Sequence, residues 1–424
     1  MKSYTLPYKP EIIVAGGGTA GCAAAIAAAR RGRKVLLIEE SNALGGTSTT
    51  GGVNEWFADL AGLGDIWDRL LAELGRYGAR FGRYYNPEVA KIVWQLMVEE
   101  AGVDVLLHAS VVDAVASDGR VISVRGVAAS HSFDIGATVF IDATGEGDLS
   151  WLAGAETMQG HPESGRTLHM SLTFILQDTG SPVTPYLPAG LVPIETQDDL
   201  PGLHGGLRLP DGRVYCNMTK VMGHDPTDPI SLSDAEREAR RQIVRIVHYL
   251  QRTRFPTYAL CSSGARIGIR EGRRVVGDVV LTEADITRET PGDVADGVAV
   301  ATCQIDFHSL TKPGHVGWRQ RVEPYAIPYR ALVVRGLENM LVAGKCISGD
   351  QVAQSSYRMT PTCCAMGQAA GTAAALALEG GVEDVRAVDV SALQAILEAH
   401  GMVLDPRQHE AFAPELTPDP TRGA

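Results

Sequence analysis

The glycines at positions 16, 18 and 21 have the spacing G-x-G-x-x-G, which is typical of a turn that holds the pyrophosphate of a dinucleotide. Gly16 allows a tight turn, Gly18 leaves room for a phosphate beside the backbone, and Gly21 lets the following helix pack closely on a strand. An acid, Glu39, follows about 20 residues after the motif, where a carboxylate can bind ribose hydroxyls. The spacing therefore predicts a dinucleotide site.

Three elements must position these residues. Residues 12–15 indicate a buried strand, residues 19–31 a helix that Gly32 ends, and residues 34–38 a second buried strand. A right-handed βαβ unit of this kind turns the free N–H groups of the helix N-terminus toward a phosphate. The alternative is an alanine-rich core helix whose glycines serve only packing, and the acid at the expected distance disfavours it. These residues leave the choice between FAD and NAD open.

Three further segments favour FAD. The loop at 42–53, NALGGTSTTGGV, offers backbone N–H groups and hydroxyls to a pyrophosphate and a ribityl chain. Residues 138–150, TVFIDATGEGDLS, indicate a strand whose small final residues let a ligand approach the backbone. Residues 339–350, NMLVAGKCISGD, indicate another such strand, with Gly344 at its end. A flexible loop and ordinary strand ends are the alternative interpretation.

The long helix near the C-terminus is predicted to begin beside the cofactor. Thr360 is a candidate N-cap, Pro361 suits the first helical position, and the glycines after Glu379 end the helix. A helix N-terminus aimed at the N1–C2=O edge of a flavin would stabilise negative charge on the reduced ring. The alternative is a buried alanine-rich helix, and both interpretations can hold because the body packs while the end binds.

The chain contains, in order, the segments VAGGGTAGCAAAIAAARRG, LGGTSTTGG, DATGEGDL, GARIGIREGRRVVGDVVLTEADI, IPYRAL and LVAGKCIS, then SSYRMTPTCCAMGQAAGTAAAL. Over residues 11–404 it resembles the FAD-dependent oxidoreductase family, which has the glutathione-reductase type of FAD fold. That family is distantly similar to succinate dehydrogenase flavoproteins and to the flavin-binding component of heterodisulfide reductase. The resemblance implies FAD as the cofactor and places the backbone near Val112 against the adenine. In relatives, a basic residue often stands at the position of Glu40 and a histidine at that of Gln351, and the cluster-binding cysteines of heterodisulfide reductase relatives are absent here.

The motifs and the resemblance together predict a cofactor-binding set made mostly of small and hydroxyl residues at turns. Its members are Gly16, Gly18, Thr19, Ala20, Gly21, Glu39, Glu40, Gly45, Gly46, Thr47, Gly52, Val112, Ala143, Thr144, Gly145, Gly344, Asp350, Pro361, Thr362 and Cys363. No metal site is predicted, because neither paired cysteine spacing nor CxxC occurs.

The predicted fold class is α/β. It has a Rossmann-like FAD-binding domain of the glutathione-reductase type, in three β/β/α layers, and an inserted α+β substrate domain. The FAD domain is expected at 1–155 and again at 336–404, with the substrate domain at 156–335 and a C-terminal tail at 405–424. Within these parts the periodicity predicts helices at 65–77, 87–101 and 232–252.

The candidates for the chemistry beside the flavin are His308, Arg270, Tyr325 and Arg358. His308 ends an alternating strand in QIDFHSL and is the best candidate for a base or substrate hydrogen-bonding group, with a turn-capping role as an equal alternative. Tyr325 can orient a substrate, although packing is the commoner role of a buried tyrosine. Arg358 precedes the final helix and should lie near the flavin. His169 could face the same cavity, although an ordinary strand position is favoured.

Arg270 recurs with Arg266 and Arg274 at every fourth position in ARIGIREGRR. On a helix the three would share one face, which suits an anionic substrate or a carboxylate network. One functional arginine beside two in ion pairs between domains is the favoured interpretation.

Composition limits the partners. A net charge of −12 and a pI near 5.4 argue against nucleic acid, and the start MKSYTLPYKPE lacks the apolar core of a signal peptide. We therefore expect a cytoplasmic protein, without a membrane span, that acts on a small molecule.

The predicted function is an FAD-dependent dehydrogenase or oxidase that transfers hydride from a small polar organic substrate to flavin N5. An NAD(P)H-dependent flavin monooxygenase and an electron-transfer protein without its own substrate are the alternatives. The acceptor (oxygen, quinone or protein) and a homo-oligomeric state stay open.

Overall fold

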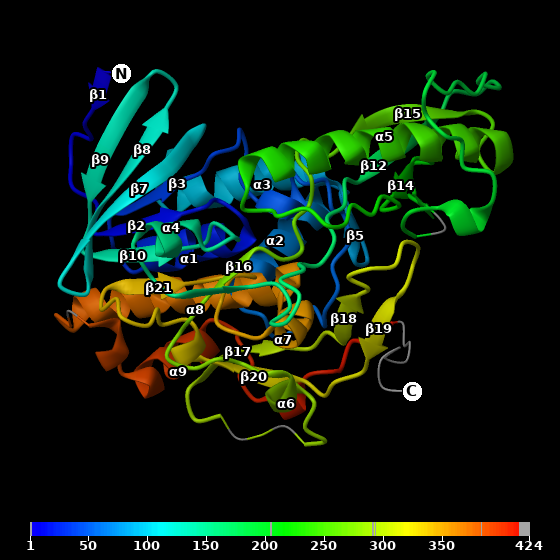
Figure 1. The fold of residues 1–424 in the computed structure, drawn as a ribbon. Coiled ribbons are helices and arrows are strands. Elements are labelled where there is room, and N and C mark those ends of the chain that lie inside the picture. Colours follow the sequence, from blue (N-terminus) through cyan, green and yellow to red (C-terminus); the bar gives the residue numbers. More distant parts are fainter. Residues whose placement is uncertain (1, 204–205, 291, 293, 383, 415–424) are drawn as a thin grey trace.

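A five-stranded sheet lies in the left part of the molecule in Figure 1. The computed structural model describes residues 2–203, 206–290, 292, 294–382 and 384–414. The sheet has the order β21-β10-β2-β3-β6 and all of its pairs are parallel. Its strands are β21 (Met340–Val342), β10 (Val139–Asp142), β2 (Ile12–Ala15), β3 (Val35–Ile38) and β6 (Asp104–Leu106). Because the strands are parallel, their carboxyl ends meet at one edge, and this is where ligands bind in open α/β sheets.

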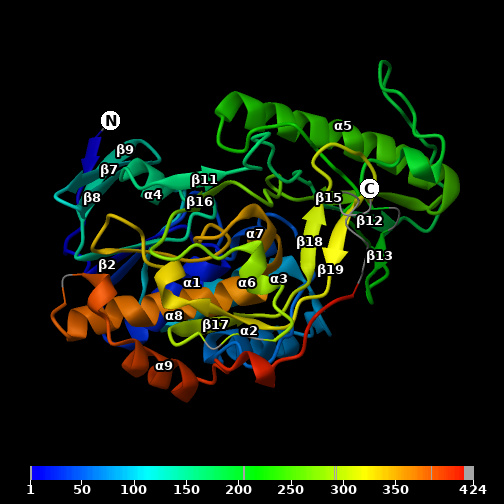
Figure 2. The same ribbon diagram turned by 60° about the horizontal axis from the view of Figure 1, so that its bottom comes forward.

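Two alanine-rich helices pack against each other beside this sheet: α1 (Thr19–Arg30) and α8 (Thr360–Glu379). Glycine permits their close approach, since a Cβ at Gly371 would lie 2.0 Å from the carbonyl oxygen of Ala24. The body of α8 is buried, as predicted. Further helices of this part are α2 (Asp65–Arg76), α3 (Pro87–Glu100), α4 (Asp148–Leu152) and α9 (Val390–Ala399), the last of which lies below α8 in Figure 2.

A second sheet stands at the upper left of Figure 1, in the order β1-β9-β8-β7. Its strands are β1 (Lys2–Tyr4), β9 (His131–Gly136), β8 (Arg120–Ala128) and β7 (Ala109–Ser117). Asp118 and Gly119 join β7 to β8 with φ angles of 51° and 75°. Positive φ at both central residues matches the right-handed twist of a two-residue hairpin. This sheet carries the start of β7 to the edge where the parallel strands end.

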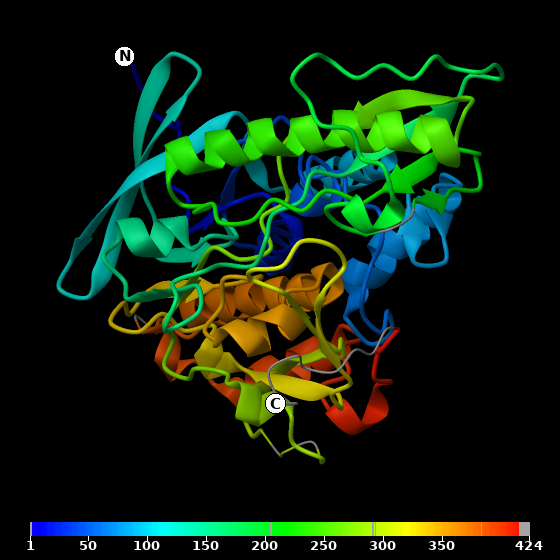
Figure 3. The same cartoon turned by 45° about the vertical axis from the view of Figure 1, so that its right-hand side comes forward.

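A separate hydrophobic core lies under the long helix α5 (Pro229–Thr253), which crosses the top of Figure 3. Asp228 caps this helix by accepting a hydrogen bond from the N–H of Ser231, and Pro229 opens it. The helix predicted at 232–252 is therefore confirmed and begins three residues earlier, at Pro229, directly after the cap. The sheet of this core has the order β13-β14-β12-β15 and consists of β13 (Leu207–Arg208), β14 (Val214–Cys216), β12 (Phe174–Asp178) and β15 (Tyr258–Ser263).

Side chains of this second core range from Met170 to Ile267. Val275, Val298 and Val334 pack instead with the first core. The predicted segment 156–335 thus divides between two cores, and its boundaries as a domain stay a prediction. In the described part of the chain, no helix is both long enough and apolar enough to cross a membrane.

Several short elements complete the fold. The paired strands are β4 (Arg80–Phe81) with β5 (Tyr84–Tyr85), β11 (Thr157–Gln159) with β16 (Arg273–Val275), β17 (Gly297–Ala301) with β20 (Tyr325–Pro328), and β18 (Ile305–His308) with β19 (Gly317–Gln320). The short helices are α6 (Glu283–Ile286) and α7 (Gln351–Tyr357).

Glu271 joins segments from different parts of the chain. Its carboxylate accepts hydrogen bonds from the N–H groups of Gly160, at 3.0 Å, and Leu168, at 2.7 Å. It also accepts from the side chain of Gln351, at 2.6 Å, and forms an ion pair with Arg274. Both charged side chains are almost fully buried, at 0% and 3% exposure. Gln351 therefore has a structural partner here.

We expect Glu271→Gln to lower the free energy of unfolding by about 3 kcal/mol, because Arg274 would remain buried without its counter-charge. Chemical denaturation of the FAD-loaded protein measures this loss. Glu73→Gln is the control: Glu73 pairs with Arg76, whose side chain is 74% exposed, and such surface pairs contribute about 0–1 kcal/mol. Equal losses in the two variants would contradict the role given to Glu271.

Candidate active site

A cavity of about 400 Å³ follows the carboxyl edge of the parallel sheet. Residues just after β2, β3, β10 and β21 line it, together with the start of β7. Beyond the N-terminus of α8, its other end is lined by residues on or near β18 and the sheet of the second core. The cavity thus has one end built by the first core and another end shared between the cores.

The glycine turn has the geometry that its spacing predicts. Gly16 has a φ of 96°, and a Cβ there would lie 2.4 Å from the carbonyl oxygen of Ala143. A Cβ at Gly21 would lie 1.8 Å from the carbonyl oxygen of Gly16, so this glycine serves close packing and does not itself line the cavity. A Cβ at Gly18 would meet no protein atom within 4 Å. Gly18 therefore faces open space at the N-cap of α1.

Glu39 is buried at the end of β3 and lines the cavity. One carboxylate oxygen accepts a hydrogen bond from the N–H of Gly17, at 2.6 Å, and the other accepts from the N–H of Ser41, at 2.8 Å. Each oxygen can accept a further bond, which suits ribose hydroxyls. Glu40 is more exposed and forms an ion pair with Arg266.

Val112 itself does not line the cavity. Its side chain is 51% exposed, whereas the three residues before it, Ala109, Ser110 and Val111, line the cavity. The predicted contact of the adenine is with the backbone near Val112, and it stays a prediction.

The loop after β3 forms another wall of the cavity. Gly45, Gly46, Thr47 and Ser48 line it, and the N–H of Gly45 donates to the carbonyl oxygen of Gly17 at 2.8 Å. Across the cavity, Ala143, Thr144, Gly145 and Gly344 line the ends of β10 and β21, as predicted. Gly52 does not line the cavity; a Cβ there would lie 2.7 Å from the hydroxyl oxygen of Thr173, so this glycine lets the two cores meet.

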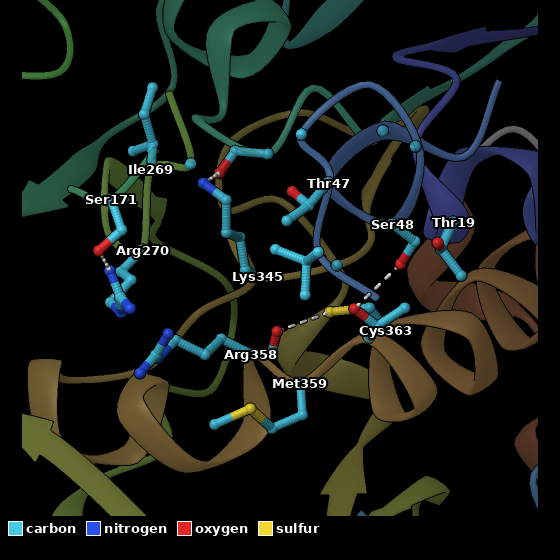
Figure 4. Close-up of a pocket in the computed structure, with 18 of the residues that line it drawn as sticks. Thr19, Thr47, Ser48, Ser171, Ile269, Arg270, Lys345, Arg358, Met359 and Cys363 are labelled. Atoms are coloured by element: carbon cyan, nitrogen blue, oxygen red, sulfur yellow. Dashed lines mark hydrogen bonds between the residues drawn. The ribbon is translucent and has the colours of Figure 1, made fainter. Parts of the chain in front are cut away.

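The N-terminus of α8 reaches the cavity through Arg358, Met359, Thr360 and Cys363 (Figure 4). The N-cap is Met359 and not Thr360, because Thr360 already has helical geometry. Pro361 and Thr362 do not line the cavity, although the hydroxyl of Thr362 is buried without a hydrogen-bond partner. Burial raises the pKa of the Cys363 thiol to about 12, so this cysteine is a neutral packing group near the cavity.

Asp306 and His308 lie on the same face of β18 at the other end of the cavity. The Nε2 atom of His308 is 3.1 Å from a carboxylate oxygen of Asp306. Asp306 also forms ion pairs with Arg358, at 3.0 Å, and Arg319, at 3.1 Å. Burial opposes its ionisation, but the hydrogen bond from His308 and the charges of Arg358 and Arg319 hold the pKa of Asp306 well below its usual range.

His308 is neutral at physiological pH. Burial lowers its pKa to about 4, although Asp306 opposes this shift. His169 packs edge-to-face on His308, with ring centroids 4.5 Å apart, and it also lines the cavity. Burial, and next the charge of Arg270, lower the pKa of His169 well below its usual value. Two neutral imidazoles therefore stand at this end.

The sequence of the chain matches the FAD dependent oxidoreductase family model over residues 11–397. The chain belongs to this family of FAD-dependent enzymes. Among curated proteins, no sequence matches it. Its fold is similar to that of a geranylgeranyl bacteriochlorophyll reductase-like protein from Thermoplasma acidophilum, with 12% identity, a TM-score of 0.46, and coverage of 93% of this chain and 88% of that one. It is also similar to CabE, an aromatic hydroxylase from angucycline biosynthesis, with 14% identity, a TM-score of 0.47, and coverage of 94% and 70%. Likenesses at this level say nothing of the substrate.

FAD fits the first end of the cavity. Gly18 leaves space at a helix N-terminus, Glu39 retains acceptor capacity for ribose, and the N–H groups in the first turn of α8 have no partner within the helix. Of the residues that the sequence predicts to bind the cofactor of this FAD-dependent oxidoreductase, those that line the cavity are Gly16, Gly18, Thr19, Ala20, Glu39, Glu40, Gly45, Gly46, Thr47, Ala143, Thr144, Gly145, Gly344 and Cys363.

Two other predicted site residues lie outside the cavity. Tyr325 is buried in β20 and donates its hydroxyl hydrogen to Ser356, at 2.9 Å. Asp350 caps α7 by accepting from the N–H of Ala353, and it also accepts from the N–H of Glu283. The polar atoms of Tyr325 and Asp350 thus form hydrogen bonds within the protein.

The arginines of the enzyme at 266, 270 and 274 do not share a helix face, because this segment is extended and irregular. Arg266 pairs with Glu40, Arg274 is buried with Glu271, and Arg270 lines the cavity. Arg266 lines the cavity as well. The predicted ion pair between distant segments is present at Arg266, whereas Arg274 pairs within its own segment, three residues from Glu271. The functional role of Arg270 stays a prediction. Sequence reasoning missed Asp306 and Lys220; the position of Asp306 two residues before His308 in a strand could have indicated it.

The depressed pKa of His308 predicts an acid-sensitive protein. An unfolded histidine titrates at about 6.5, so between about pH 6.5 and pH 4 the unfolded chain binds more protons and stability falls as pH falls. From about pH 7 to pH 5 we expect His308 to account for a loss of about 2 kcal/mol. Denaturation at both pH values measures it, with His308→Gln as the comparison. The His308→Gln variant should lose less stability than the wild type between these pH values. It should still lose some, because the pKa of His169 is lowered in the same direction. An equal loss in the two proteins would show that His308 is not the group responsible.

Proposed function

We propose that this enzyme is a dehydrogenase or oxidase that transfers hydride from a small polar organic substrate to flavin N5. In this proposal its fold is of the glutathione-reductase type, and the second core belongs to a substrate domain inserted into the FAD-binding domain. The observation that carries the proposal is the Asp306–His308 pair, which faces the same cavity as the glycine turn and the α8 N-terminus.

His308 is suited to accept a proton. Asp306 is ionised and acceptor-only, so the contact at 3.1 Å assigns the hydrogen to Nε2 of His308 and leaves Nδ1 to act as base. Hydride leaves a carbon more easily when a neighbouring O–H or N–H loses its proton to such a base. Asp306 then stabilises the imidazolium that forms.

The bound FAD supplies the hydride acceptor. The first turn of α8 offers free N–H groups and a positive dipole end at this part of the cavity. Arg358, just before that turn, is held by the carbonyl and carboxylate oxygens of Asp306, which fixes its guanidinium at the cavity wall.

Anaerobic mixing of the FAD-loaded enzyme with alcohols, hydroxy acids, sugars and amines tests the proposal by bleaching of the flavin. At least one class should bleach it directly. Rapid bleaching by NADPH alone, with none by the panel, would favour a monooxygenase. Reduction only by a partner protein would favour an electron-transfer protein.

A further inference from the structure

Among the residues that the structure describes, the end of the cavity around His308 is lined by more basic side chains than carboxylates. The carboxylates are those of Asp306 and of Glu55, which interacts with the hydroxyl of Tyr84. The basic side chains that line this end are Lys220, Arg270, Arg319 and Arg358. Arg319 and Arg358 both form ion pairs with Asp306.

Arg270 has no carboxylate partner among the described residues. Its guanidinium donates to the carbonyl oxygen of His169, at 3.2 Å, and to the hydroxyl of Ser171, at 2.8 Å. Figure 4 shows Arg270 and Arg358 on the same side of the cavity. Burial, and next the charge of Arg358, lower the pKa of Arg270 to about 10, so two like charges face each other in a poorly solvated place.

Lys220 adds a third cation. Its ammonium is buried and donates to the backbone carbonyl oxygens of Lys312, at 2.7 Å, and Gly314, at 3.0 Å. Burial, then Arg270 and Arg319, lower its pKa to about 8. Both acceptors are neutral carbonyl groups, so they do not offset the positive charge of Lys220.

Polar atoms without partners lie in the same wall. Nδ1 of His169 and the side-chain oxygen of Gln304 are buried without a hydrogen bond, on side chains that are 5% and 3% exposed. The Nε atom of Arg358 is also buried without a hydrogen bond. Buried polar groups normally have partners, and a polar ligand in the cavity would supply them.

We propose that the substrate is a small organic carboxylate whose anionic group binds between Arg270 and Arg358. The planar guanidinium fork matches a carboxylate, and the anion relieves the repulsion between the two cations. The proposal rests on the proposed function, because it names the substrate class of the same site.

Isothermal titration of the FAD-loaded enzyme with malonate and with malonamide tests this inference. FAD occupies the phosphate-binding end, and neither probe has a hydroxyl or amine-bearing carbon to oxidise. Malonate should bind at least tenfold more tightly than malonamide. Arg270→Gln should weaken malonate binding at least tenfold, and Arg270→Lys should recover part of the loss.

The control is Arg330→Gln, which removes a positive charge that pairs with Asp296 outside the cavity and should leave the dissociation constant unchanged. Flavin content and the thermal midpoint check that each variant folds. If Arg270→Gln does not fold, the binding of malonate to Arg270→Lys is compared with that to the wild type. Binding of malonamide as tight as that of malonate, tighter binding of inorganic phosphate, or no effect at Arg270 would overturn the inference.

The two proposals fail differently. If a neutral alcohol or amine bleaches the flavin while malonate does not bind, the carboxylate inference is wrong and the proposed function stands. If malonate binds through Arg270 and no compound of the panel bleaches the flavin, the anion site stands and the proposed function is wrong.

Discussion

His308→Gln is expected to slow reduction of the flavin by its substrate about 10²–10⁴-fold, the usual contribution of a positioned base. Glutamine keeps a hydrogen-bonding group toward Asp306 but cannot take a proton. Because His308 lies at the end of the cavity away from the glycine turn, the variant should still bind FAD. Anaerobic stopped-flow mixing, with the compound that bleaches the wild type, measures the rate.

A matched control is His131→Gln. His131 lies on β9 and does not line the cavity, so its replacement should leave the rate within about twofold of wild type. A His308→Gln variant that reduces its flavin as fast as this control would exclude His308 as the base.

Gly18→Ala should weaken FAD binding while the chain still folds. The backbone of Gly18 has φ −65° and ψ 178°, which alanine adopts without strain, and the added Cβ meets no protein atom within 4 Å. That space is where the pyrophosphate approaches the backbone in this motif. Crowding by one methyl group makes the binding free energy of FAD less favourable by about 1–3 kcal/mol. The dissociation constant of FAD should therefore rise about ten- to a hundredfold.

Titration of the apoprotein with FAD, followed by flavin fluorescence, measures this change. Gly75→Ala is the control, because a Cβ at this glycine of α2 also meets no atom within 4 Å and Gly75 does not line the cavity. If Gly18→Ala bound FAD as tightly as Gly75→Ala, the pyrophosphate would not bind beside Gly18. If Gly18→Ala unfolded the apoprotein, the argument from open space would be wrong.

The local elements could be predicted from the sequence because neighbouring residues determine them. The glycine turn, the acid after β3 and the helix at 232–252 each depend on residues within a few positions. Short-range geometry also explains the errors, which lie at element ends. The N-cap expected at Thr360 is Met359, one position earlier, and the long helix begins at Pro229 and not at residue 232.

By itself, the sequence determined the FAD-binding end of this protein, since one βαβ motif and the small residues at the strand ends specify a dinucleotide cradle. Only the tertiary structure decided the other end. It folded 264–272 as an extended segment and not a helix, so Arg270 lines the cavity while Arg274 is buried outside it, and it brought Lys220 and Arg319 to the same cavity. The physical reason is that charge in a cavity depends on which distant segments pack together, and packing between two cores leaves no periodic pattern in the chain.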